Sequence, residues 1–141
     1  MKSTILAMLA LCALSLISLS GCKGDPVADN PNAIALKTSV HYQELLLLPP
    51  GCMLTVSLQN ISQLNSATNT VASTTVTVQA APPYEVILKY DAQRISDRLS
   101  YALHARIELD GQLLFTNNTR IDPFAGPAGQ PIKILVQKVK R

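Results

Sequence analysis

Residues 101–116 read YALHARIELDGQLLFT, and this stretch decides the fold. Apolar side chains occupy every second position from 101 to 109, and mostly polar or charged ones stand between them. Successive side chains of a β-strand point to opposite sides, so the pattern predicts a strand with one buried and one solvated face. Asp110-Gly111 follows, a pair suited to the positive φ angles of a type I′ turn. We therefore predict a hairpin in which residues 113–120 pair with the strand at 99–110.

Working outward from this hairpin, period-two patterns predict most of the remaining chain as short strands. They fall near 34–42, 54–59, 70–78, 84–89 and 132–136. Turn residues separate them at 49–51, 60–69, 80–83 and 122–131, and residues 91–97 form either one helical turn or a polar loop. About seven short strands without a long helix predict an all-β fold. The expected architecture is a single small β-sandwich, or a partly closed barrel, of mostly antiparallel strands.

The N-terminus indicates export. Residues 5–19 carry no charge, follow Lys2, and form a run too short to span a bilayer comfortably. The junction Leu19-Ser20-Gly21-Cys22 resembles the bacterial lipobox, in which a signal peptidase cleaves before a cysteine that carries lipid. The alternative is an uncleaved membrane-spanning anchor.

These features divide the chain into three regions. Residues 1–21 are expected to be a cleaved lipoprotein signal peptide, 22–33 a lipidated N-terminus and flexible tether, and 34–141 the sandwich domain. Two or three acyl chains on Cys22 would hold the protein firmly to a membrane. Because Lys23 rather than Asp follows, by analogy with enterobacterial sorting, we expect the outer membrane, facing the periplasm, rather than the inner membrane.

Charge and cysteine content reduce the number of functions that the sequence allows. Removing Lys2 lowers the formal net charge from +3 to +2, which implies no strong electrostatic partner. Aromatic and basic residues do not interleave, which argues against nucleic acid. Cys12 leaves with the signal peptide and Cys22 carries lipid, so only Cys52 remains, with no partner for a disulfide. It has no base nearby in the sequence and is expected to be a small buried residue rather than a nucleophile.

No catalytic or metal-binding constellation is visible in the sequence. Glu108 and Asp110 share a strand face, but a solvated carboxylate and a turn residue explain them more simply than an acid–base pair. His41 and His104 are the two histidines and lack a third ligand at suitable spacing, so exposed strand histidines are expected rather than a metal site. We expect no enzyme activity, no cofactor and no metal.

Four stretches resemble the YscW/YbaY-type family of bacterial envelope lipoproteins, a type III secretion lipoprotein chaperone family. They are VHYQE at 40–44, LPPGCMLTVSL at 48–58, KYDAQRI at 89–95 and the opening stretch at 101–116. The similarity covers roughly residues 36–139. Cys52 and Ala92 depart from the family pattern, where a small residue such as Ala and a Pro are expected. The resemblance implies a β-sandwich lipoprotein without known catalysis and, in the YscW branch, a pilotin.

Three functions follow as hypotheses. The first is a lipid-anchored, non-enzymatic lipoprotein of the YbaY type that acts as a protein-binding or structural module. The second is a pilotin-like chaperone that helps a type III secretion secretin reach and assemble in the outer membrane. The third is a periplasmic lipoprotein that binds a small ligand or glycan in a lumen lined by Tyr42, Tyr84 and Tyr101. The expected partners are membrane lipid and an envelope protein such as a secretin. The shared residues do not choose between the first two functions, and we favour the first because it needs no specialised partner.

Overall fold

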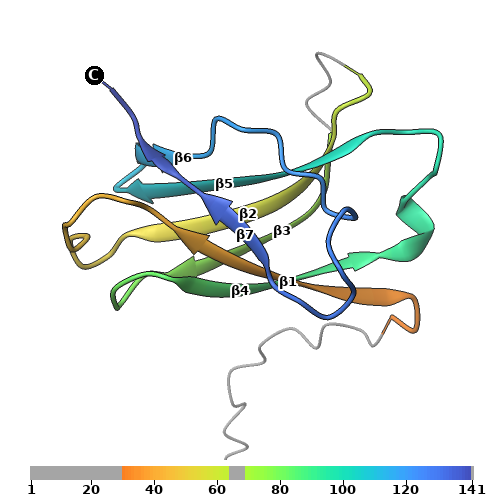
Figure 1. Ribbon diagram of the computed structural model, residues 1–141, viewed down its shortest axis with the longest axis horizontal. Helices are drawn as coiled ribbons and strands as arrows, with labels where there is room; N and C mark the ends of the chain where they lie inside the picture. The colour runs from red at the N-terminus through yellow and green to blue at the C-terminus, as the bar shows by residue number, and fades with distance from the viewer. Residues whose placement is uncertain (1–29, 64–68, 141) are drawn as a thin grey trace, which may run out of the picture.

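The computed structural model describes residues 30–63 and 69–140, which form two β-sheets packed face to face. Figure 1 shows β1 and β7 crossing in front of β2 and β3. The three-stranded sheet has the order β4-β1-β7, with bounds Tyr84–Asp91, Ala33–His41 and Ile132–Leu135. The five-stranded sheet has the order β3-β2-β5-β6-β8, with bounds Thr70–Thr77, Met53–Asn60, Tyr101–Leu109, Gln112–Thr116 and Gln137–Lys138. The predicted all-β sandwich is confirmed.

The hairpin that was predicted from residues 101–116 is present, because its turn and pattern are local. Asp110 and Gly111 have φ of 49° and 77°, as a type I′ turn requires. The returning strand β6 ends at Thr116 and is shorter than the predicted 113–120. The register shifts between Ile107 and Glu108, which indicates a bulge in this hairpin.

The C-terminal segment, with strands β7 and β8, joins the two sheets. Strand β7 runs parallel to β1, with Ile134 opposite Val40, and Val136 then donates its N–H to the His41 carbonyl. After Val136 the chain changes sheet, and β8 pairs with β6. The predicted strand over 132–136 therefore lies along β1, and the chain continues beyond it into the second sheet; β1–β7 is the one parallel pairing among the described strands.

The other side of the sandwich is formed by the edge strands β3 and β4. They form no backbone ladder within the described residues, so the sheets do not close into a barrel. Side chains bridge the two edges instead. Thr74 Oγ1 donates to the Ile87 carbonyl at 3.4 Å, and the Arg94 guanidinium donates to the carbonyls of Thr70 and Val71. Arg94 belongs to the short 3₁₀ helix Ala92–Arg94, where one helical turn was among the expectations.

The core lies between the sheets and is built from the inward positions of each strand, as the period-two pattern requires. Its fully buried side chains include Leu54, Leu58, Leu103, Ile107 and Phe115 of the five-stranded sheet, and Val40, Leu88 and Ile134 of the other. Thr38 is buried among them, and its hydroxyl donates to the Val86 carbonyl at 2.8 Å. Within the described residues no helix is long and apolar enough to cross a membrane.

Candidate partner-binding site

The loop from β1 to β2 exposes leucines to water. We call residues 43–50 the leucine loop. Leu45 is fully exposed, Leu47 is 76% exposed, and Leu46 is 37% exposed. Three neighbouring leucines in water are unusual for a folded domain, and contiguous exposed apolar surface marks binding sites for proteins, ligands or membranes.

Local chemistry holds this loop in place. The Tyr42 hydroxyl donates to the Leu46 carbonyl at 2.8 Å, which closes the first part of the loop. Leu48 turns inward and packs against the core. Pro49 and Pro50 each fix φ, and Gly51 then adopts a φ of +91°, a conformation that favours glycine. Because the loop is anchored at Tyr42, Leu48 and Gly51, the leucines between these points remain outside the core.

Open grooves flank the leucine loop. One of about 530 Å³ lies between Leu47–Pro50 and the segment 77–81 that follows β3. Another of about 390 Å³ lies beside Tyr42, Ala81 and Pro82. On the far side of the loop, a groove of about 990 Å³ has Glu44 on one wall and Lys138 and Lys140 on the other. The leucines therefore stand between grooves that could receive side chains from a partner.

Below the leucine loop lies a cluster of aromatic residues. Tyr42 stacks on Phe115 with ring centroids 5.0 Å apart, and its ring lies 6.4 Å from that of Tyr84. The Tyr84 hydroxyl is buried without a hydrogen-bond partner among the described residues. Burial, and secondarily the neighbouring Tyr42 side chain, raises the pKa of Tyr84 well above its usual value. This hydroxyl therefore stays protonated at physiological pH.

The tyrosines do not form the common lumen that the sequence suggested. Tyr101 lies at the opposite end of the sandwich, since it pairs with Asn60 at the far end of β2. There its ring meets Phe124, and its hydroxyl accepts from the backbone N–H of Ser96 at 3.0 Å. The three tyrosines therefore line no common lumen and are part of the core instead, which removes that basis for the ligand-binding hypothesis.

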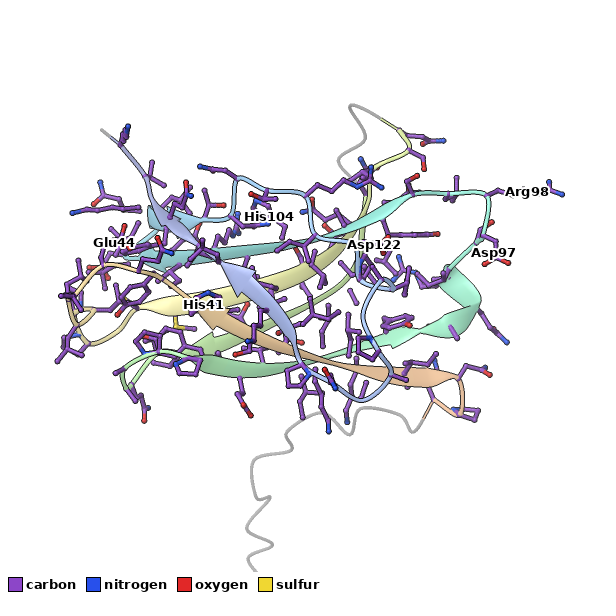
Figure 2. All side chains as sticks on the ribbon, in the orientation of Figure 1. His41, Glu44, Asp97, Arg98, His104 and Asp122 are labelled. Atoms are coloured by element: carbon purple, nitrogen blue, oxygen red, sulfur yellow. The ribbon has the colours of Figure 1, made fainter. Side chains whose placement is uncertain are left out.

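The leucine loop and the start of the domain lie at opposite ends. Strand β1 begins at Ala33, close to Asn30 where the described chain starts, and ends at His41, just before the loop. Figure 2 shows Glu44 at the loop end and Asp97 and Arg98 at the other end. The nine residues of β1 span about 30 Å at 3.3 Å per residue.

The polar residues that were considered from the sequence do not come together as a site. His104 lies on β5 and His41 on β1, in different sheets, and Figure 2 labels both. Glu108 pairs with Arg106 at 3.6 Å on the solvent side, and Asp110 is a turn residue, as predicted. Among the described residues no three His, Cys, Asp or Glu side chains gather as metal ligands.

Of the remaining candidate residues, the structure describes Cys52 but not the four residues of the predicted lipidation motif. Cys52 is fully buried and free, as predicted, and burial followed by the charge of Asp110 raises the pKa of its thiol. Leu19, Ser20, Gly21 and Cys22 lie outside the described residues, so lipidation of Cys22 stays a prediction.

Sequence reasoning missed the leucine loop. The run Leu45–Leu48 precedes Pro-Pro-Gly, and only the turn at 49–51 that follows it was predicted. The usable signal was four consecutive leucines outside any alternating pattern, since a half-buried strand would place a polar residue at every second position.

The fold and this end of the molecule define a small β-sandwich with an exposed apolar loop. In a comparison with protein-family models, residues 31–135 match YscW, described as "Type III secretion system lipoprotein chaperone (YscW)". The chain belongs to this family. Among solved structures it is similar to an alternative pilotin from the type II secretion system of Vibrio cholerae. The two share 27% sequence identity with a TM-score of 0.64, over 76% of this chain and 99% of that one. Among curated proteins no sequence matches.

Proposed function

We propose that the protein is a lipid-anchored, non-enzymatic chaperone of the outer membrane that binds a segment of a secretin with its leucine loop. The family match over residues 31–135 carries this proposal. The likeness to a pilotin supports the same role. Of the functions considered from the sequence, the comparisons thus favour the pilotin-like chaperone over the general structural module.

The exposed leucines support a groove-binding mode. A partner strand would need a free sheet edge, but β7 and β8 bridge the sheets on one side. On the other side Thr74 and Arg94 already bind carbonyls across the gap between the edges. An apolar partner segment can instead bury Leu45 and Leu47 and place side chains in the flanking grooves. Fully burying one leucine contributes about 1.5–3 kcal/mol, so these two together contribute about 3–6 kcal/mol of binding.

The anchor fits this function. Lipid on Cys22 would hold the protein at the membrane where a secretin assembles, and the leucine loop lies at the end of the domain away from the tether. The leucine loop would then remain accessible to a partner instead of being buried at the attachment point.

A deletion strain tests the role. Without the protein, we expect secretin to be lost from the outer-membrane fraction, and the wild-type gene to restore it. A gene carrying Leu45→Ser and Leu47→Ser is expected to fail although its product accumulates normally. The matched control carries Ile34→Ser and Leu99→Ser, two exposed apolar residues near the other end, and should restore secretin.

Normal secretin levels in the outer membrane of the deletion strain would refute the chaperone proposal. Full rescue by the leucine-loop variant would instead retain the chaperone role and remove the leucine loop as its binding site. Crosslinking the lipidated protein in its own envelope, followed by mass spectrometry, identifies the partner directly.

A further inference from the structure

Three lysines form a diagonal row on the outer face of the three-stranded sheet. Lys89 of β4 lies opposite Ala35 of β1, and Lys133 of β7 lies opposite Ser39. Lys37 stands between those two positions on β1, two residues from each. All three lysines point outward and are exposed. Since neighbouring strands are about 4.8 Å apart, the row crosses the whole sheet within a short distance.

The charges of this row are not neutralised by ion pairs. Among the residues that the structure describes, the one ion pair is Arg106–Glu108 on the other sheet. Two acidic side chains lie on the same face, Glu85 opposite Ser39 and Asp91 opposite Ala33, which leaves a net charge of +1 for these two and the three lysines. The Asp91 carboxylate keeps its charge, since it accepts hydrogen bonds only from two uncharged donors, the Asn30 side chain and the Gln93 N–H.

An exposed apolar residue lies within the lysine row. Ile87 is opposite Lys37 and is 53% exposed. We call Lys37, Lys89, Lys133 and Ile87 the lysine face. Basic side chains around an apolar one suit the boundary of a bilayer, where phosphate groups lie beside the first methylenes.

The position of the chain start brings this face close to the predicted anchor. The Asn30 side chain donates to Asp91 Oδ2 at 3.0 Å, and Asp91 follows Lys89 by two residues on β4. The start of the described chain therefore lies close to Lys89. Cys22 precedes Asn30 by eight residues, which extend at most about 28 Å at 3.5 Å per residue. Lipid on Cys22 therefore keeps this corner of the sheet within that distance of the bilayer.

We propose that the lysine face lies against the phosphate groups of anionic phospholipids in the membrane that holds the anchor. Strand β1 then runs along the membrane, and the leucine loop at its end points sideways over the surface rather than into the periplasm. A partner that is already inserted in that membrane would meet the leucine loop directly. The proposal rests on the lipid anchor of the proposed function, although the face itself consists of described residues.

Vesicle binding of the lipid-free chain tests the face. The protein would be residues 23–141, which contain all the described strands and core, in co-sedimentation with vesicles of phosphatidylcholine alone or mixed with phosphatidylglycerol. We expect binding to the mixed vesicles only. It should disappear in about 1 M salt, where the Debye length falls to about 3 Å.

Matched variants locate the contact. A basic residue near an anionic surface contributes about 1 kcal/mol, or about fivefold in affinity, so Lys37→Gln with Lys89→Gln should weaken binding about 25-fold. Lys138→Gln with Lys140→Gln removes the same charge from the C-terminal segment and should have little effect. Lys133→Gln alone should weaken binding about fivefold. Melting temperatures establish that each variant is folded.

Equal binding to both kinds of vesicle would overturn the proposal, as would equal weakening by the two double variants. The mass of the protein purified from membranes tests the anchor separately. Lipid on Cys22 together with no preference for anionic vesicles would retain the anchor and refute the lysine face.

Discussion

Asn117 replaces a missing strand at the end of β6, and its removal should strongly destabilise the fold. Its side chain is buried where β5 continues beyond its hairpin partner. Oδ1 accepts from the Ala105 N–H at 2.8 Å, and Nδ2 donates to the carbonyls of Leu103 and Thr119, each at 3.1 Å. Asn117→Ala leaves the Ala105 N–H and the Leu103 carbonyl without these partners inside the protein. At about 1–3 kcal/mol for each unsatisfied group, we expect a loss of about 3 kcal/mol.

Urea denaturation followed by circular dichroism measures this loss. With a slope of about 1.5 kcal/mol per molar urea, the unfolding midpoint should fall by about 2 M. The neighbouring Asn118 is the control, since it is exposed and bonds only the exposed Gln137 side chain, at 3.0 Å. Asn118→Ala should change stability by less than about 0.5 kcal/mol. Midpoints that fall equally in the two variants would refute the assigned role of Asn117.

Three further predictions concern single residues. Cys52 is fully buried and burial raises its pKa, so a thiol reagent at neutral pH should leave the folded protein unmodified and label it in denaturant; rapid labelling of the folded protein would contradict this. Burial and the charge of Arg106 lower the pKa of His104, so the unfolded state takes up its proton first as pH falls below about 6.5. Stability should therefore decrease from pH 6.5 down to the lower folded pKa, and His104→Gln should flatten this part of the urea-midpoint profile; an unchanged slope would argue against it. Gly111 has a φ of +77° with open space around it, so Gly111→Ala should cost about 1 kcal/mol in thermal unfolding through backbone strain alone, and an unchanged melting temperature would mean that the turn relaxes.

The sequence predicted those parts of the fold that depend on near neighbours. The alternation over 101–109 and the Asp-Gly pair specify strand β5 and its turn, since strand faces and turn angles are local properties. The same reasoning placed β1, β2, β3 and β4 within a few residues of their observed bounds. It also assigned Cys52 to the core correctly, because the residue enters an apolar run.

Other features depended on contacts between distant segments. The pattern over 132–136 predicts a strand, but it does not say which sheet this strand joins or that the chain changes sheet after Val136; contacts with His41 and with β6 decide this. The early end of β6 likewise depends on Asn117, whose side chain takes the place of strand pairing. Tyr42, Tyr84 and Tyr101 share an inward pattern, yet only the first two lie together, because β5 begins at the other end.

For the functional surfaces, too, some features follow from the sequence and others only from the tertiary structure. By itself the sequence determined that the domain is a β-sandwich and predicted that lipid attaches at Cys22, since both follow from short motifs and a period of two. Only the tertiary structure decided that Leu45 and Leu47 remain in water and that three lysines from separate strands line up on one face. Exposure and alignment are properties of packing between segments far apart in the chain, and no local pattern determines them.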